Sequence, residues 1–227
     1  MKERQRAFGS TEMVRDRPSR TRSRTTRKKT RAEKTEANRE ALFWAAAEVV
    51  GRHGYSAASI ARITARAKMA QGTFYNYFES RQEIFDQLLP RLGEQMLEHV
   101  REMARDGRDF GEKEELSLRA FFDFLRVQPH FLRILSEAET HAPKAFKRHM
   151  SNVSQGYIAF LKRSRARNEI KNLGDQEIEA IAYILMASRS YLGLRYLGNL
   201  PPSMKKKLPD HVVDAYMQLV ADGLAKQ

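Results

Sequence analysis

Residues 54–85 read GYSAASIARITARAKMAQGTFYNYFESRQEIF, and this stretch decides the fold of the N-terminal part of the protein. Its first half predicts a short helix, because a serine precedes apolar residues at positions i, i+3 and i+7. The serine is Ser59, whose side chain can cap the helix, and the apolar residues are Ile60, Ile63 and Ala67. About four residues then separate this helix from a second short one.

The second half of the stretch, QGTFYNYF at residues 71–78, has four aromatic residues among eight. Phe74 and Phe78 are four apart, so they share one face of a helix and can hold it on the domain. Five residues are left facing outwards: Gly72, Thr73, Tyr75, Asn76 and Tyr77. Hydroxyls and a carboxamide can contact phosphates and base edges, and a glycine lets the backbone approach DNA closely. Two short helices after a longer one therefore predict a helix-turn-helix. An aromatic-rich core helix would explain the phenylalanines but not both tyrosines and Asn76.

Longer helices flank this motif. Before it, apolar residues at helical spacing predict a helix that ends at Gly54, with a stripe of Leu42, Phe43, Ala46, Val49, Val50 and His53. After it, Ser80 and Glu83 form a capping box that starts another helix. Pro90 lies inside that helix and is expected to kink or split it.

The rest of the chain also has helical periodicity, and no run shows the alternation typical of strands. Further helices are predicted within residues 114–128, 130–139, 143–164 and 174–198, and from Pro209 onwards. The sequence therefore predicts an all-α protein of about nine helices.

The stretch at residues 54–85 resembles the DNA-binding signature of the tetracycline-repressor (TetR) family of bacterial transcriptional regulators. The resemblance rests on Gly54-Tyr55, Ser59, Ile63, Gly72-Thr73-Phe74-Tyr75, Tyr77-Phe78 and Ser80. It covers about residues 36–88, and helix count and length extend it loosely to the C-terminus. It implies an N-terminal three-helix DNA-binding domain with a helix-turn-helix at residues 34–80. A helical domain for effector binding and dimerisation would follow at residues 81–227.

The resemblance also implies the residues that contact DNA: Ser59, Gln71, Thr73, Tyr75, Asn76, Tyr77 and Arg81, the last through a phosphate. Gln71 rests on the family alone, because helical spacing places it nearer the buried side.

Two residues depart from the family pattern. Lys68 stands where the family usually has glycine in the turn. This position often needs a positive φ, a conformation that costs a residue other than glycine about 1 kcal/mol. Ala70 replaces the usual serine, so the second helix lacks a side-chain cap typically worth about 1 kcal/mol.

Charge independently indicates a polyanionic partner. The chain has 41 Lys and Arg against 28 Asp and Glu, a net charge of +13, which favours double-stranded DNA or an anionic membrane surface. Residues 1–31 carry twelve Lys or Arg and three acidic residues, a net +9. Because this part has few apolar residues, we expect residues 1–33 to form a disordered basic arm. The alternatives are a transit peptide, which should show an apolar helical face, and a start codon assigned too far upstream.

The last two helices predict a homodimer. The helix within residues 174–198 is apolar on nearly all faces, so its own core must cover one side and a partner subunit the other. The predicted interface residues are Ile181, Leu185, Leu192 and Tyr196, with Val213, Met217 and Val220 of the last helix. A second apolar set lies on other faces of the first of these helices: Ile184, Met186, Tyr191 and Leu194. A fully buried central helix in a monomer is the alternative.

Family resemblance implies a small-molecule effector, and eight apolar residues of the middle segment, five of them aromatic, are candidates for its pocket. They are Phe121, Phe124, Leu125, Phe131, Leu135, Phe146, Met150 and Tyr157. Such residues fit an ordinary hydrophobic core equally well. If a ligand binds, they favour a small hydrophobic molecule with a long chain, such as an acyl group.

Other classes of function find little support. The chain has no cysteine, which excludes disulfides and thiolate metal sites, and no membrane span, so a cytoplasmic protein is expected. The six histidines show no metal-ligand spacing, and His141 and His149 are expected to be solvated. There is no nucleophile elbow or phosphate loop, so neither an enzyme nor a cofactor is predicted.

The predicted function is a DNA-binding repressor that a small hydrophobic ligand releases from a palindromic operator. A DNA-organising protein, or an activator without a small-molecule effector, is the alternative reading of the same residues. An enzyme built on a helical bundle has no motif in its favour.

Overall fold

The computed structural model describes residues 30–197 and 207–224. These residues form eight α-helices and one 3₁₀ helix, without a strand. In chain order the helices are α1 (Arg31–His53), α2 (Ile60–Arg66), η1 (Gln71–Asn76), α3 (Arg81–Ala104), α4 (Phe110–Val127), α5 (Phe131–His141), α6 (Pro143–Ala166), α7 (Asp175–Tyr196) and α8 (Asp210–Leu224). The predicted all-α fold is confirmed.

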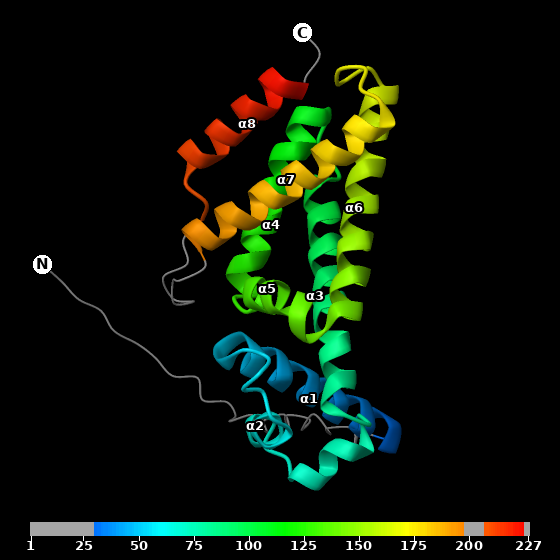
Figure 1. Cartoon of the computed structure of the whole chain (residues 1–227), viewed down its shortest axis with the longest axis vertical. Helices are drawn as coiled ribbons and strands as arrows, with labels where there is room; N and C mark the ends of the chain where they lie inside the picture. Colours follow the sequence, from blue (N-terminus) through cyan, green and yellow to red (C-terminus); the bar gives the residue numbers. More distant parts are fainter. Residues whose placement is uncertain (1–29, 198–206, 225–227) are drawn as a thin grey trace, which may run out of the picture.

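The helices form two parts that share α3. Figure 1 shows α1, α2 and η1 at one end of the molecule and α4 to α8 at the other, with α3 running between them. We call the first part the reading head. The N-terminal half of α3 packs on α1, and its remainder packs against α4 and α6.

Two local signals set the ends of α1. Thr30 and Glu33 form a capping box, in which the Glu33 backbone N–H donates to Thr30 Oγ1 and the Thr30 N–H donates to Glu33 Oε2. The helix therefore begins at Arg31, so the last three residues of the predicted arm are helical, while residues 1–29 lie outside the described part of the chain. Gly54 ends the helix at a φ of 82°, a conformation that glycine adopts without steric cost. His53 of the predicted apolar stripe is exposed.

Pro90 does not split the helix in which it lies. α3 continues through it for 24 residues, so that option was wrong. A proline removes one backbone hydrogen bond, and the buried residues Leu88, Leu89 and Leu92 on both sides hold the helix on the core.

α5 attaches the reading head to the rest of the molecule, and we call this contact the junction. The carboxylate of Glu137 accepts from the Tyr55 backbone N–H at 2.8 Å, and Arg133 donates to the Arg52 carbonyl oxygen at 2.9 Å. The ring of His141 stacks on Tyr55 with centroids 5.7 Å apart. The His130 ring fills the space beside Gly51, where any Cβ would lie 2.2 Å from it.

Among the described helices, none has the length and apolar character that crossing a membrane requires.

Candidate DNA-binding surface and effector cavity

η1 presents a mostly polar surface at the end of the reading head. Gln71, Gly72, Tyr75 and Asn76 are exposed and Thr73 is half-buried. Phe74 and Phe78 are buried with ring centroids 5.5 Å apart, so the phenylalanine pair holds η1 on the head as expected. Nothing lies within 4 Å of where a Cβ of Gly72 would be, which leaves open space in front of the backbone.

Tyr77 differs from this expectation. Its side chain is half-buried against the core, and its hydroxyl accepts a hydrogen bond from Asn38 Nδ2 of α1 at 2.8 Å. The reason is that η1 is a 3₁₀ helix, in which residues three apart eclipse, so Tyr77 follows the buried Phe74. Gln71, which a helical wheel placed nearer the buried side, is exposed at the first residue of η1.

Ser59 and Arg81, the remaining predicted contact residues, are exposed at helix N-termini. Ser59 Oγ accepts from the Arg62 backbone N–H and caps α2. Arg81 is the first residue of α3, and its guanidinium lies over the Phe85 ring at 5.4 Å from the centroid. Backbone N–H groups and cations at helix N-termini suit contact with phosphates.

The turn between α2 and η1 has the backbone and capping features expected from Lys68 and Ala70, the two departures from the family pattern. Lys68 has a φ of 57°, the left-handed conformation for which glycine is the usual residue. Ala70 precedes η1 without a side-chain capping bond.

A cavity of about 650 Å³ lies between α3, α4, α5, α6 and α7. Its interior is mostly apolar, and its walls include Leu97, Val100, Phe121, Phe131, Leu135, Met150, Val153, Tyr157 and Phe160. Three cations line it towards the α3–α4 turn: Arg101, Lys113 and Arg163. None of them forms a salt bridge within the described chain. The cavity therefore combines an apolar end with a basic end.

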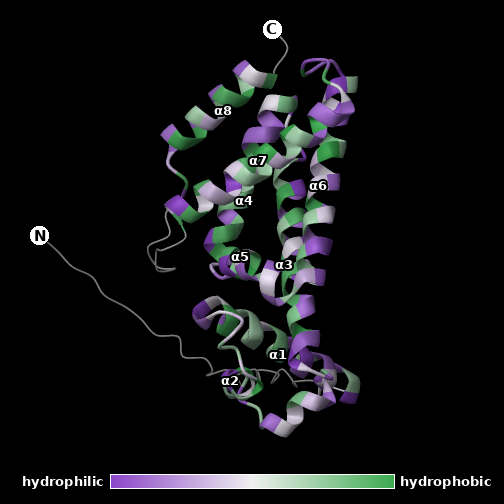
Figure 2. Cartoon of the chain, in the orientation of Figure 1, coloured by the Kyte–Doolittle hydropathy of each residue, from purple (hydrophilic) through white to green (hydrophobic). Residues whose placement is uncertain are grey.

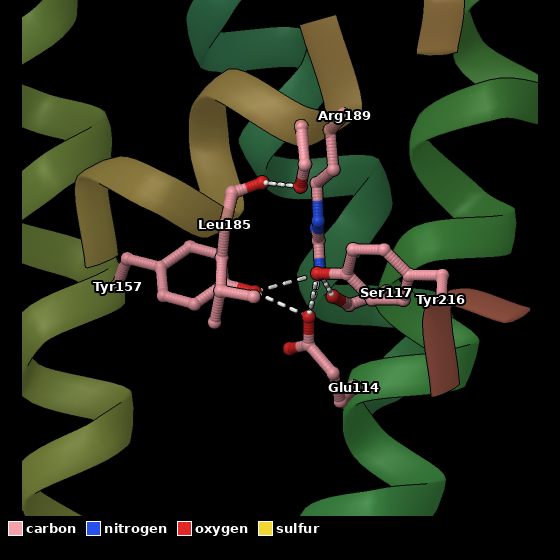
Figure 3. A network of polar contacts seen from close by, with 7 residues as sticks. Glu114, Ser117, Tyr157, Leu185, Arg189 and Tyr216 are labelled. Carbon is pink, nitrogen blue, oxygen red and sulfur yellow. Dashed lines mark hydrogen bonds and ion pairs between the residues drawn. The ribbon is translucent and has the colours of Figure 1, made fainter. Parts of the chain in front are cut away.

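A buried polar cluster forms part of the cavity wall (Figure 3). Arg189 of α7 donates through Nη2 to Glu114 Oε1 and Ser117 Oγ of α4, both at 2.7 Å, and to the Tyr157 hydroxyl of α6 at 2.9 Å. The hydroxyls of Tyr157 and Tyr216 donate to Glu114 Oε1 at 2.5 and 2.6 Å. Because Tyr216 belongs to α8, the cluster joins four helices.

Burial dominates the electrostatics of this cluster. It raises the pKa of Tyr216 to about 12 and that of Tyr157 well above its ordinary value of 10. Burial disfavours the charged guanidinium of Arg189, but attraction to Glu114 outweighs this and raises its pKa. Arg189 is therefore charged and both tyrosines are neutral near pH 7.

The sequence pattern described as "Bacterial regulatory proteins, tetR family" matches residues 42–88, which contain most of α1, the whole helix-turn-helix and the start of α3. This match identifies residues 42–88 as a DNA-binding region of the TetR type.

Comparison with characterised TetR-type proteins gives two related sequences and one similar structure. The chain is 26% identical over 118 residues to the fatty acid metabolism regulator protein of Bacillus subtilis, and 30% identical over 102 residues to the transcriptional activator FasR of Mycolicibacterium smegmatis. The alignments cover 52% and 45% of this chain, and 60% and 47% of those relatives, so the chain spans about half the length of the curated relatives it matches. The crystal structure of FadR from Bacillus subtilis in complex with stearoyl-CoA superposes with a TM-score of 0.69 at 18% identity, covering 81% of this chain and 98% of that one. This likeness shows that the whole TetR-type fold is present.

Five of the eight predicted pocket residues line the cavity: Phe121, Phe131, Leu135, Met150 and Tyr157. Phe124, Leu125 and Phe146 do not. Phe124 packs edge-on against the outer side of Phe131, with centroids 5.3 Å apart, while Leu125 is buried and Phe146 is partly buried in the core. Periodicity shows that a residue is inside but not whether it faces a cavity or another side chain.

No pattern in the sequence predicted the polar and charged residues of the cavity. Arg189 and Glu114 are two of several charged residues in their helices, and only their burial distinguishes them. His149, expected to be solvated, is buried beside Gly93 at the cavity wall, and burial lowers its pKa to about 4. The missing side chain at Gly93 is the one sequence signal that could have indicated this packing.

The predicted dimer residues lie mostly within their own subunit. Leu185, Val213 and Val220 are buried, and Ile181, Leu192, Tyr196 and Met217 are partly buried against the core. The residues exposed on α7 and α8 are instead Tyr183, Ile184, Tyr191, Leu194 and Leu219, and we call them the exposed apolar face. Figure 2 shows hydrophobic residues along both helices. The stripe with regular spacing is covered by the chain itself, which leaves Ile184, Tyr191 and Leu194 of the second apolar set exposed, while Met186 of that set lines the cavity.

Proposed function

We propose that this protein is a transcriptional regulator that binds operator DNA through η1 and α2 and releases it when a long-chain acyl compound with an anionic head occupies its cavity. The proposal rests on the cavity, because the cavity joins an apolar interior to unpaired cations. In addition, α5 lines the cavity and contacts the reading head. A volume of about 650 Å³ lies within the usual range for ligand pockets. The relatives that are fatty acid regulators, and the similar structure with bound stearoyl-CoA, support the same class of ligand.

The layout of the cavity fits such a molecule from end to end. The apolar walls between α5 and α6 would bury the chain, and Arg101, Lys113 and Arg163 would pair with phosphates or another anionic group. A cation that has no partner in the free protein loses no existing ion pair when it binds the ligand.

α5 provides a route from the cavity to DNA. Its residues Phe131 and Leu135 face the cavity, while Arg133, Glu137 and His141 hold the reading head at the junction. A ligand that displaces α5 would therefore move the head of each subunit. In a symmetric dimer this changes the spacing of two recognition elements that must fit half-sites about 34 Å apart.

DNA fragments selected by the purified protein provide the probe for a test with a matched pair of variants. Gly156 lines the cavity with nothing within 4 Å of its Cβ position, so Gly156→Phe would fill the cavity without a backbone clash. Gly223 of α8 is equally open and lies outside the cavity, so Gly223→Phe is the control. Fluorescence anisotropy should show that stearoyl-CoA releases the selected DNA from the wild type and the control but not from Gly156→Phe. Release from all three proteins, or from none, would contradict the proposal.

The basic arm remains a separate prediction. If it follows phosphates, deleting residues 1–29 should flatten the dependence of log affinity on log salt, by about 0.9 for each phosphate it neutralises, and leave the preferred site unchanged. Binding to the selected DNA over a range of salt concentrations measures both quantities. Equal slopes for the full chain and the truncated chain would rule out a role in DNA binding.

A further inference from the structure

Two hydrogen-bond donors in the polar cluster lack an acceptor. Arg189 Nε is buried without a hydrogen-bond partner. Ser117 Oγ accepts from Arg189 and, in the described chain, donates to no other group, so its own hydrogen is available. Both residues line the cavity, and Figure 3 shows them beside each other in the cluster. A buried donor without an acceptor is destabilising, and a ligand oxygen would remove that penalty.

Ser117 lies where the basic end of the cavity meets its apolar end. Lys113, Ser117 and Phe121 are four residues apart on α4, so they share one face at intervals of about 6 Å, and all three line the cavity. A ligand with its anionic head at Lys113 and its chain at Phe121 would place the group that joins them next to Ser117.

The charge of the cluster restricts what that group can be. Arg189 is paired with the carboxylate of Glu114, and Tyr157 and Tyr216 are neutral, so the cluster has no net charge. A carboxylate brought in by the ligand would be a second anion on one buried cation and would remain uncompensated. A neutral oxygen acceptor adds no charge.

We propose that Ser117 and Arg189 form a subsite that binds a neutral carbonyl oxygen of the effector, so that the protein recognises the carbonyl group of an acyl thioester. This inference rests on the proposed function, because it names the chemistry of the link between the head and the chain of the same ligand. It assigns a binding role to the polar cluster, which otherwise only joins α4, α6, α7 and α8.

The test compares two ligands that differ at the carbonyl. Stearoyl-CoA has the thioester, and its thioether analogue octadecyl-CoA has a methylene in place of the carbonyl. Ser117→Ala should weaken binding of stearoyl-CoA about threefold to tenfold in calorimetry, the value of one hydrogen bond, and leave binding of octadecyl-CoA unchanged. Ser117→Thr retains a hydroxyl and should restore the difference between the ligands. Arg189 is left in place because its loss would leave Glu114 buried and unpaired.

Ser190→Ala is the matched control. Ser190 also lines the cavity, but its hydroxyl already donates to the Met186 carbonyl oxygen at 3.2 Å, so the substitution should alter both affinities by the same factor.

The outcomes separate the inference from the function it rests on. If Ser117→Ala weakens both CoA ligands equally, or neither, the carbonyl subsite is wrong, while release of DNA by stearoyl-CoA would still support the proposed function. If neither CoA ligand binds, both are wrong.

Discussion

Tyr75 and Tyr77 are two residues apart, and their surroundings assign them to different tasks. Tyr75 is 59% exposed at the end of the reading head, whereas Tyr77 is half-buried and bonded to Asn38. Asn76 lies between them and is exposed. At this scale the direction of a side chain decides whether a substitution changes DNA binding or folding.

Asn76→Ala and Tyr75→Ala should therefore leave thermal unfolding nearly unchanged and weaken operator binding. If Asn76 contacts a base, Asn76→Ala should weaken the binding free energy by about 1–3 kcal/mol and relax the base preference at one position of the operator. Tyr77→Phe is the contrasting variant: it removes the bond with Asn38 and should lower the free energy of unfolding by about 1 kcal/mol. Binding to the selected site together with denaturant unfolding distinguishes the two effects. Unaltered binding by Asn76→Ala would show that the residue does not contact DNA.

Lys68 offers a second test at the same scale. Its φ of 57° is unfavourable for a residue with a Cβ, so Lys68→Gly should raise the free energy of unfolding by up to about 1 kcal/mol. Lys68→Ala keeps the Cβ and serves as the control, because it removes the same charge without relieving the backbone. Urea denaturation measures both variants. Equal stability of the two variants would mean that the turn is not strained.

Among the elements, α5 packs on α1 of the reading head and also on α3, α6 and α7. It contributes Phe131 and Leu135 to the cavity and holds the reading head through side chains that face the other way. Glu137 is central to the junction, since it accepts from the Tyr55 backbone N–H and from Arg133 Nε, both at 2.8 Å.

The junction should depend on pH through Glu137. Burial alone would raise the pKa of this carboxyl, but the hydrogen bonds from Arg133 and Tyr55 outweigh it and hold the pKa below the ordinary 4.5. A lowered pKa means that the carboxylate stabilises the folded state above pH 4.5 and that this contribution disappears as the pH falls through the folded pKa. Wild type should exceed Glu137→Gln in stability by about 1 kcal/mol at pH 7, and the two should converge in acid. Thermal melts between pH 7 and pH 3 measure the difference, and a constant gap over that range would contradict the assignment.

At the scale of the whole molecule, we expect two subunits to assemble through the exposed apolar face on α7 and α8. Ile184 and Leu219 are 62% and 70% exposed, so a charge at either position is tolerated in the subunit but not in a dry contact between two subunits. Val127 at the end of α4 is 69% exposed and lies outside this face.

Light scattering should thus find a dimer for the wild type and for Val127→Asp, and a monomer for Ile184→Asp and Leu219→Asp at micromolar concentration. All three variants should melt as single cooperative units, because each change is on the surface of the subunit. A monomeric wild type, or dimeric Ile184→Asp and Leu219→Asp, would place the subunit contact elsewhere or exclude it.

The sequence by itself determined the helices of the reading head and their likeness to the TetR-type DNA-binding region. Capping residues such as Ser59 and Ser80, the glycine at position 54, and the pair Phe74 and Phe78 act over three or four residues, so their effect can be read without the rest of the chain. The left-handed turn at Lys68 is equally local.

Only the tertiary structure decided which buried residues surround a cavity and which apolar face remains open. Phe121 lines the cavity and Phe124 packs behind it, although both are buried aromatic residues of α4. Glu114 and Arg189 are 75 residues apart in the chain, and no local pattern shows that they pair. Each of these outcomes depends on the packing of helices distant in sequence, because a helical period specifies the side that faces inwards and not the group that it meets there.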